Sequence, residues 1–588
     1  IDIFLKRPDS DRFVIEYVSP HPDHLSIAEL ESVEVQLMQT ADGFVAPRAG
    51  LPEIPTSIAE INAQQPRRYY ASAVLKVAED LVRHFNSQGI IGVFIAPREL
   101  NLSTGQDARA PGDGTVTLEV FTVSVSTVRS IASGNRIDSE DRIDSARHAR
   151  IRNNSPIAPG GEGGNLLRRD RLDRYVNRLN RHPGRRVDVA VSPDETPSSA
   201  VLDYLIYEAK PWTIYAQVDN TGTEATQEIR QRIGFVHNQL LGNDDIFTLD
   251  YVTAGFEDAH AIFGTYEFPL GNTGVRGKVF GSYSEYEASD VGQAGNNFSG
   301  ESYSLGGEVI WNVYQRGQFF ADVYAGLRFA NYSVSSPLGD DGDADAFYPG
   351  GGIRLERIVE TDAFTADLGF EAAIGDEEDF ETIGRVEPDD VGLIVRWDAR
   401  YSLYLEPLLN YDAWADVSTP GSSTLAHEVA FRLSGQNALG TRLIPNDQAV
   451  SGGLYTIRGF DESVVAGDNQ VIASAEYRFH LPRAFAIEPE PRQFLGQPFR
   501  FAPQQVYGRP DWDLALKAFV DVGFTDSNDE QLFENDETLI GAGVGVDFSF
   551  RRNVIARVDW GFILDGIDGD ADNGDGENRL HFVVTVLY

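Results

Sequence analysis

Cysteine is absent from this 588-residue chain, and methionine occurs only once. A chain that avoids thiol chemistry suits an extracytoplasmic bacterial protein. No run of about 18 apolar residues occurs either, so the sequence predicts no transmembrane helix. The start also lacks the charged and then apolar segment of a secretory leader. Because Ile1 cannot be an initiator, we expect a processed or trimmed product.

Basic residues are scarce relative to acidic ones: 49 Lys and Arg stand against 90 Asp and Glu, a net charge of -41. Up to Pro211 the chain has 25 basic and 29 acidic residues, and beyond it 24 and 61. Nearly all the excess acid therefore belongs to the second part. A nucleic-acid binder would show the opposite sign, so that class is disfavoured. The 56 Gly, 23 Tyr and 34 Phe suit short strands and tight turns.

The first part of the chain predicts a small α+β unit. Alternation indicates a strand at 12–19, and an apolar stripe indicates a helix at 71–87, which Gly89 ends. Further strands are predicted at 90–95 and 115–128, whereas residues 40–70 look irregular. The unit is either a docking module or a spacer.

A second α+β unit follows, with a helix at 166–182 and strands at 187–192 and 200–208. We place boundaries after residues 11, 128 and 210, which gives an N-terminal remnant (1–11), two α+β units (12–128 and 129–210) and a final region (211–588). One face of the second helix is strongly basic. It is either a solvated surface or a contact for anionic lipid headgroups or an acidic client. Its arginines are Arg168, Arg169, Arg171, Arg174, Arg178 and Arg181.

From Trp212 onward, strands of about ten residues alternate between an apolar face and a charged one, as at 393–405, 471–481 and 554–564. A soluble sandwich would place its charged face outside and use strands of about five or six residues. Ten-residue strands with a charged second face indicate lipid outside and a wet lumen inside. The predicted fold class is a membrane β-barrel of about 16 antiparallel strands, preceded by two small α+β domains.

Loop lengths predict the orientation of this barrel. Connections at 240–244, 269–274 and 551–553 are short, whereas alternate ones are long and acidic. Short turns face the periplasm in outer-membrane barrels, so both ends of the barrel region are expected there. The connection at 482–511 is an exception, since it is long yet falls on the periplasmic side, and we have no functional account of it. The long acidic loops are 292–297, 339–346, 376–381 and 565–578.

The acidic loops invite a calcium interpretation. Asp568, Asp570 and Asp572 have the spacing that opens an EF-hand loop, but Asn573 replaces the turn glycine and Arg579 the bidentate glutamate. A solvated loop tip is the better interpretation. No Ser/His/Asp, HExxH or P-loop arrangement occurs, so we predict no catalytic residues, no cofactor, no metal and no enzyme.

The segment SGGLYTIRGFDES (451–463) carries Arg458 in a glycine-rich loop on the outer side of the barrel. A following strand at 514–524 turns Phe519, Asp521 and Gly523 toward the lumen. If the loop folds inward, Arg458 can form a charge-assisted pair with Asp521. The alternative is a mobile external loop with Arg458 in water. Gly541, Gly543 and Gly545 share one strand face and leave a bare wall against which the loop could lie.

Two short motifs and one longer stretch resemble a known family. IRGF (457–460) resembles the [VI]RG[FY] motif of the POTRA-plus-barrel outer-membrane superfamily, and FVDVG (519–523) resembles its F-x-D-x-G strand motif. Residues 179–212 and 218–226 resemble the second POTRA domain and first strand of two-partner secretion transporters, the TpsB or haemolysin-secretion type. The resemblance implies a sixteen-stranded barrel in the outer membrane with two POTRA domains in the periplasm.

The resemblance also implies a function. The transporter would export a large, unfolded, β-helical exoprotein without nucleotide hydrolysis. A lock of Arg458 and Asp521, with Gly459, Phe460, Phe519 and Gly523, would hold the long loop (about 440–470) in the lumen. The basic residues Arg168, Arg171, Arg174 and Arg178 would contact client or lipid. We expect a monomer in outer-membrane lipid, with no nucleic-acid partner.

Some features depart from the family pattern. The family has an N-terminal helix that plugs the pore, whereas about eleven residues precede the first strand here, so the plug is absent, cleaved or outside this sequence. Residues 20–70 match poorly. An insertase of the same superfamily is the alternative function, although insertases typically carry more POTRA domains. A passive porin would need no POTRA domain.

Overall fold

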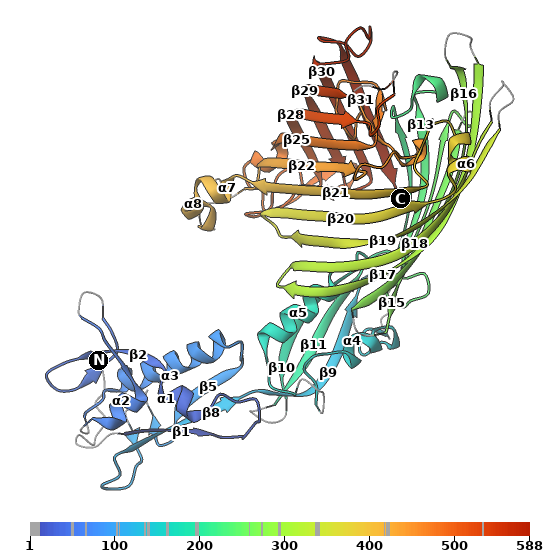
Figure 1. Cartoon of the computed structure of the whole chain (residues 1–588). Helices are drawn as coiled ribbons and strands as arrows, with labels where there is room; N and C mark the ends of the chain where they lie inside the picture. The colour runs from blue at the N-terminus through green and yellow to red at the C-terminus, as the bar shows by residue number, and fades with distance from the viewer. Residues whose placement is uncertain are drawn as a thin grey trace. The chain divides into compact units, whose positions relative to one another are not determined.

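The computed structural model divides the chain into two compact units, one ending at Ala209 and the other spanning Lys210–Tyr588 (Figure 1). The predicted remnant 1–11 lies outside the described residues, as do parts of the loops at 292–297 and 339–346. No described helix is long and apolar enough to cross a membrane. The structure describes residues 12–48, 52–64, 67–101, 104, 106–134, 137, 141–159, 164–194, 199–257, 259–271, 274–291, 296–335, 341–416, 418, 424–531, 534 and 536–588.

The first unit begins with a three-stranded sheet in the order β1-β8-β5, made of β1 (Arg12–Tyr17), β8 (Thr115–Thr122) and β5 (Val93–Pro97). Helix α3 (Ala71–Ser87) packs on this sheet through an apolar stripe that includes Val74, Leu81 and Phe85. The helix predicted at 71–87 is confirmed. A small hairpin, β6 (Leu100–Asn101) and β7 (Gln106–Asp107), precedes β8.

The segment predicted to be irregular, 40–70, is structured, and that prediction was wrong. A second small sheet in the order β3-β2-β4 begins just before it and runs through it. Its strands are too short for alternation to show, yet Ser57 and Glu60 form a reciprocal capping box at the start of α2. The S-x-x-E pattern was therefore a missed sign of a helix. The elements are α1 (Ile27–Glu31), β2 (Glu34–Gln39), β3 (Phe44–Val45), β4 (Ile54–Ser57) and α2 (Ile58–Ala63).

The strand predicted at 115–128 is in fact two strands in different sheets. After β8, strand β9 (Ser124–Ser133) pairs with β11 (Ser199–Glu208), which β10 (Arg185–Pro193) flanks. The two sheets thus divide at Val123 rather than after 128. Alternation changes phase at this point, because the buried positions are even in β8 whereas the first buried residue of β9 is Val125. The sequence prediction overlooked this shift. Helices α4 (Ala149–Asn153) and α5 (Arg169–Leu179) belong to this second sheet, and Leu172 and Leu179 of α5 lie in its core.

The second unit is a closed barrel of sixteen strands, each antiparallel to its neighbours, and β12 pairs with β31 to complete it. The predicted strand number is confirmed. Strand length varies from 8 residues in β12 to 21 in β17. The strands are β12 (Trp212–Asp219), β13 (Arg230–Asn238), β14 (Ile246–Ala254), β15 (Ala259–Leu270), β16 (Val275–Val291), β17 (Asn296–Arg316), β18 (Phe319–Ser335), β19 (Gly342–Ile358), β20 (Asp362–Ile374), β21 (Val391–Tyr404), β22 (His427–Asn437), β25 (Asn469–His480), β28 (Trp512–Asp526), β29 (Glu537–Phe550), β30 (Val554–Asp565) and β31 (Asn578–Leu587).

The barrel wall has the two faces that the sequence predicts. Large apolar side chains such as Leu393, Tyr401 and Trp560 are exposed on the outside. Charged side chains point inward and pair with one another across strands, for example Arg354 with Glu308. The outside therefore suits lipid and the inside suits water.

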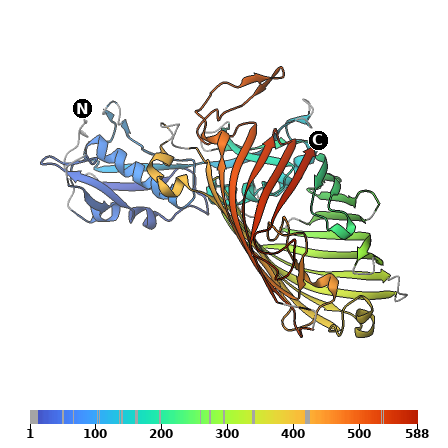
Figure 2. The same cartoon turned by 90° about the horizontal axis from the view of Figure 1, so that it is seen from above.

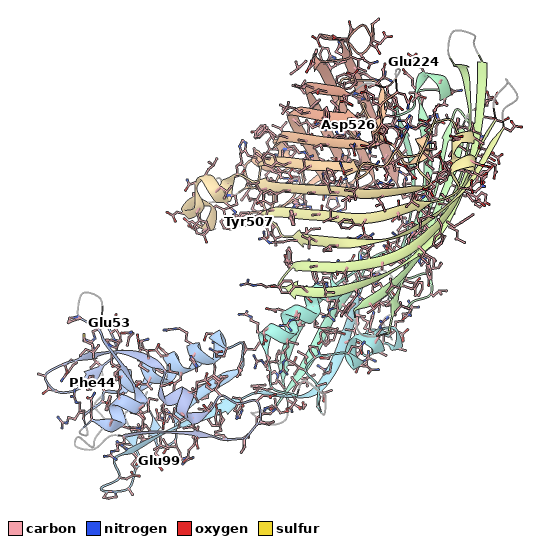
Figure 3. All side chains as sticks on the ribbon, in the orientation of Figure 1. Phe44, Glu53, Glu99, Glu224, Tyr507 and Asp526 are labelled. Carbon is pink, nitrogen blue, oxygen red and sulfur yellow. The ribbon has the colours of Figure 1, made fainter. Side chains whose placement is uncertain are left out.

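Two long connections, not one, lie on the side of the barrel where its first strand begins. Besides 481–511, which carries β26 (Arg492–Phe494) and β27 (Gln497–Phe499), residues 405–426 carry α7 (Glu406–Leu409) and α8 (Tyr411–Ala415). The sequence prediction had missed the second connection. The two meet where the rings of Trp414 and Tyr507 lie 5.7 Å apart. Figure 2 shows the hairpin of β26 and β27 projecting beyond the ends of the barrel strands, and Figure 3 labels Tyr507 close to α7 and α8. The Tyr507 hydroxyl also donates to the Trp414 carbonyl.

Candidate functional site

The loop between β22 and β25 enters the barrel. Its stem is a two-stranded hairpin of β23 (Ala449–Ser451) and β24 (Val465–Gly467), and its tip carries Arg458. Asp521 on β28 is fully buried, whereas its neighbours Val520 and Val522 are exposed on the outer face. Asp521 thus points into the lumen, and Arg458 meets it there.

The Arg458 guanidinium holds Asp521 with both ends of its fork. Nε lies 2.7 Å from one carboxylate oxygen and Nη2 lies 2.8 Å from the other. The backbone N–H of Arg458 donates to the same carboxylate at 3.1 Å. Two parallel charge-assisted bonds fix orientation as well as distance, which a lysine could not do.

Two further carboxylates complete the site, and sequence reasoning missed both. Nη1 of Arg458 donates to Glu476 on β25 at 2.7 Å and to Asp559 on β30 at 3.1 Å. Phe519 on β28 places the centroid of its ring 3.4 Å from the guanidinium carbon. Glu476 and Asp559 are inward positions of alternating strands, so the alternation marked them as lumen residues. The order of strands around the barrel was needed to bring them to Arg458.

Two of the three carboxylates, Glu476 and Asp559, also pair with cations other than Arg458. Lys517 and Arg557 lie 2.8 and 2.7 Å from Asp559, and Arg478 lies 2.5 Å from Glu476. A buried charge without a partner costs several kcal/mol, and this network leaves none of these groups isolated. Removing one member would unbalance the rest. We call Arg458, Asp521, Glu476 and Asp559 the lumen cluster.

Glycines beneath the loop allow its backbone to approach the wall. A Cβ on Gly541 would lie 2.0 Å from the Arg458 carbonyl oxygen, and one on Gly561 would lie 2.4 Å from the Gly459 nitrogen. Gly523 likewise makes room for Ile457. Of the predicted bare wall, only Gly541 lies directly under the loop. A Cβ on Gly543 or Gly545 would instead meet other wall atoms, and Gly561 was missed.

Apolar contacts and an external loop also hold the tip. Ile457 and Phe460 are fully buried in a cluster with Ile472, Leu539 and Ile563. Gly459, whose φ of +110° favours glycine, donates its N–H to His581 at 3.2 Å. The buried side chain of Asn573 accepts from the Asp461 N–H at 2.9 Å. The loop at 565–578 was expected to be a solvated tip, and at Asn573 that expectation was wrong.

A second ionic cluster, which we call the outer cluster, fixes the base of the same loop. Arg385 donates to both oxygens of Asp468, at 2.5 and 2.9 Å, and to Glu534 at 3.2 Å. Arg442 donates to both oxygens of Glu534, at 2.7 and 2.9 Å. The outer cluster joins three external connections: 375–390 with α6 (Glu377–Thr382), 438–468 and 527–536. Each arginine lies in a loop, where no periodicity marks it.

The arginines of α5 belong to the first unit and take no part in the lumen cluster. Arg168 pairs with Asp170 at 3.0 Å and donates to the Gln88 carbonyl at 3.1 Å. Arg174 and Arg178 are exposed and Arg171 is half-buried. The face is therefore accessible, and what it contacts stays a prediction.

Comparisons with known proteins agree with this architecture. Residues 202–333 match the family model described as haemolysin secretion/activation protein ShlB/FhaC/HecB. Outer membrane transporter CdiB-2 of Burkholderia pseudomallei (strain 1026b) is 30% identical over 95 residues, which are 16% of either chain. The match to this relative thus spans about a sixth of its length.

Solved structures share the fold across nearly the whole chain. CdiB from Escherichia coli has a TM-score of 0.64 at 14% identity, covering 99% of this chain and 90% of that one. CdiB from Acinetobacter baumannii has a TM-score of 0.59 at the same identity and coverages. BamA from Haemophilus ducreyi lacking POTRA domains 1-3 has a TM-score of 0.50 at 13% identity, covering 99% and 100%.

A closed, lipid-facing barrel that follows small α+β domains defines an outer-membrane β-barrel protein with POTRA domains in the periplasm. Within that class, residues 202–333 match the haemolysin secretion/activation family, and the relative that shares 30% identity over 95 residues is an outer membrane transporter. The resemblance drawn from the sequence is confirmed. The family is one of transporters and secretion channels rather than a class of enzymes.

Substituting Gly541 by valine should expel the loop tip while leaving the barrel folded. A side chain there would overlap the Arg458 carbonyl, and valine is otherwise favoured in strands. Arg458 is 3% exposed, so trypsin should spare it in the wild type and cleave after it in Gly541→Val. Heat-modifiable migration in gels would report barrel folding. Gly264→Val is the control, since the nearest atom to its added Cβ is 3.8 Å away. Equal resistance of Gly541→Val and wild type would contradict this account.

Replacing Arg385 by alanine should destabilise the outer cluster, because Asp468 is fully buried and would lose its bidentate partner. Breaking a buried ion pair costs about 3–5 kcal/mol, whereas an exposed pair contributes about 0–1 kcal/mol. The urea midpoint should fall clearly for Arg385→Ala and barely for Arg357→Ala, because the Arg357 side chain is 45% exposed where it pairs with Asp362. Similar midpoints for the two variants would show that the outer cluster is not needed for stability.

Proposed function

We propose that this protein exports one large exoprotein through its barrel, in unfolded form and after capture by the periplasmic POTRA domains. The observation that carries the proposal is a loop held inside the lumen by one bidentate side chain, Arg458. A passive porin would need no POTRA domain, whereas small α+β domains precede the barrel here. The loop can leave and return without dissociating, which suits a pore that opens only for its client.

Strand edges in the first unit suit capture of an extended polypeptide. Strand β10 is an edge of its sheet, and so is β5 in the other sheet. Backbone hydrogen bonds to an exposed edge require little of the client's sequence. The basic face of α5, with Arg168, Arg171, Arg174 and Arg178, supports a contact with acidic segments of the client or with anionic headgroups.

The lumen cluster acts as the lock in this proposal. Arg458 contacts β25, β28 and β30, so release of its side chain frees the loop from three strands at once. Gly459, Phe460, Phe519 and Gly523 provide the close packing around the lock. Folding of the client outside the cell supplies the pull, and no nucleotide is used.

Arg458→Ala and Asp521→Ala should each reduce secretion of the client by roughly tenfold or more, since the first leaves the buried Asp521 without its cation and the second removes the bidentate partner of Arg458. Secreted and cell-associated client would be measured by immunoblot. Arg400→Ala is the matched control, because Arg400 also faces the lumen but is well exposed and pairs with Asp398. Normal secretion by both variants, with the barrel correctly inserted, would refute the lock.

Deleting the gene separates export from the alternative, an insertase of the same superfamily. Loss of a single large exoprotein from the medium supports export. Broad loss of barrel proteins from the outer membrane supports an insertase instead. Quantitative proteomics of medium and outer membrane would provide both measurements on one strain.

A further inference from the structure

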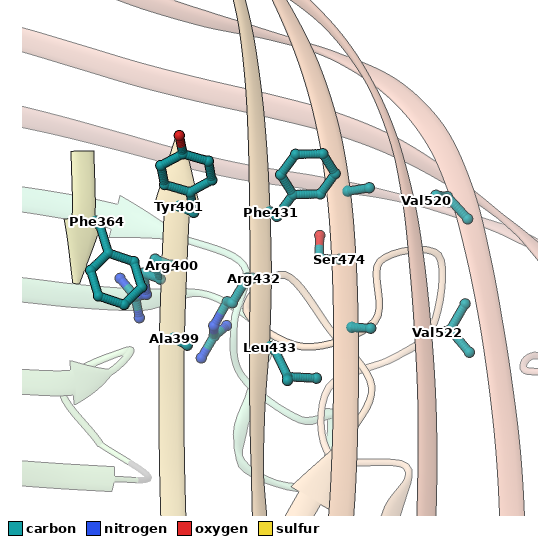
Figure 4. Close-up of a pocket in the computed structure, with 12 residues that line it drawn as sticks. Phe364, Ala399, Arg400, Tyr401, Phe431, Arg432, Leu433, Ser474, Val520 and Val522 are labelled. Atoms are coloured by element: carbon teal, nitrogen blue, oxygen red, sulfur yellow. The ribbon is translucent and has the colours of Figure 1, made fainter. Parts of the chain in front are cut away.

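The lipid-facing wall contains a groove of about 380 Å³ that crosses β21, β22, β25 and β28 (Figure 4). Its floor consists of three alanines, Ala399, Ala473 and Ala475. Its rim includes two rings and a leucine, from Tyr401, Phe431 and Leu433. The volume lies within the range of small-molecule binding sites, which is roughly 300–1,000 Å³.

The register of the strands builds the groove. Tyr401 lies opposite Phe431, which lies opposite Ala475; in the next row, Ala399 lies opposite Leu433, which lies opposite Ala473. Side chains directly opposite one another on a sheet are close neighbours, so each alanine lowers the surface beside a bulky group. Because every strand is bonded on both sides, the groove cannot close by collapse.

The polar residues of these strands face the other way. Arg432 donates to the Tyr455 carbonyl inside the barrel at 2.5 Å, and the Ser474 hydroxyl donates to Asp521, also at 2.5 Å. In Figure 4, Arg400 and Arg432 lie behind their strands. Among the described lining residues, the outward side chains are apolar apart from the Tyr401 hydroxyl. A headgroup would find little to bind, whereas hydrocarbon would fit.

The depth of the groove selects a leaflet. Ala475 lies five residues from His480, the periplasmic end of β25, and Tyr401 lies three residues from Tyr404, the periplasmic end of β21. The groove is continuous with the lipid-facing surface and runs from Tyr401 toward the middle of the wall, where Val522 lies ten residues from Trp512, the periplasmic end of β28. Its end near Tyr401 opens to the acyl chains of phospholipids in the periplasmic leaflet.

We propose that this groove is a binding site for one acyl chain of a phospholipid from the periplasmic leaflet. In an unfilled groove the lining side chains lack dispersion contacts, and a flexible acyl chain restores these contacts. The acyl chain would lie directly behind the lumen cluster. Ala475 is flanked in sequence by Ser474 and Glu476, whose side chains contact Arg458 from the opposite face of β25.

Photolabelling of the full-length protein in nanodiscs tests the proposal. The discs would contain phosphatidylethanolamine and phosphatidylglycerol, with a trace of phospholipid carrying a diazirine on its acyl chain. Peptides of β22 and β25 should carry roughly fivefold more label than the equally apolar wall of β17 and β18. Ala473→Phe and Ala475→Phe should each fill the groove and reduce the label to the level of that wall.

Ala325→Phe is the matched control. Ala325 is exposed on β18, six residues from Phe319 at the periplasmic end, so the change adds the same ring at similar depth outside the groove. Labelling should remain unchanged in this variant. Equal labelling of both walls would show passing lipid only. Persistence of the label in Ala473→Phe and Ala475→Phe, or dimers cross-linked through β22 and β25, would also overturn the proposal. Heat-modifiable migration would show that each variant is folded.

Discussion

The buried guanidinium of Arg458 sets the requirements for everything around it. A cation removed from water must be matched by anions at hydrogen-bonding distance, and here they come from β25, β28 and β30. Strand β29, which lies between β28 and β30, contributes Gly541 instead of a carboxylate. The backbone of the loop therefore occupies the position that a side chain of β29 would fill. One charge thus explains the identities of residues on four neighbouring strands.

The long loop is held at two places with different surroundings. Near its base, the outer cluster ties Arg385 and Arg442 to Asp468 and Glu534 among external connections. At its tip, the lumen cluster ties Arg458 to strands of the wall itself. The base is therefore held by contacts that are separate from those of the tip.

Alternation was sufficient to predict the barrel, because a strand between lipid and water must change polarity at every residue. Alternation also turned Asp521 toward the lumen, but the resemblance of IRGF and FVDVG to family motifs was needed to favour its pairing with Arg458 over a mobile external loop. The contacts with Glu476 and Asp559 depend on which strands become neighbours after closure. The change of sheet between β8 and β9 does leave a local trace, because the apolar positions change from even to odd between Val120 and Val123, and the prediction of a single strand overlooked it.

Short or irregular elements were the other source of error. The sheet of β2, β3 and β4 has strands of two to six residues, in which a period of two is hard to recognise. The connection at 405–426 was overlooked because α7 and α8 have only four and five residues. The arginines of the outer cluster lie in loops. Their burial depends on contacts with other loops, so no periodic pattern in the sequence marks them as buried.

The unequal lengths of the strands have a consequence for the exit of the pore. About 9–11 residues of a tilted strand cross the hydrocarbon layer, whereas β17 has 21 residues and β16, β18 and β19 have 17 each. Since the periplasmic turns of these strands are short, the excess stands above the outer surface of the membrane. These strand ends form a raised rim along one side of the extracellular opening, whereas the wall at β12 and β13 stays close to the membrane surface. A polypeptide leaving the pore would be sheltered by protein in one direction and free to spread in the other.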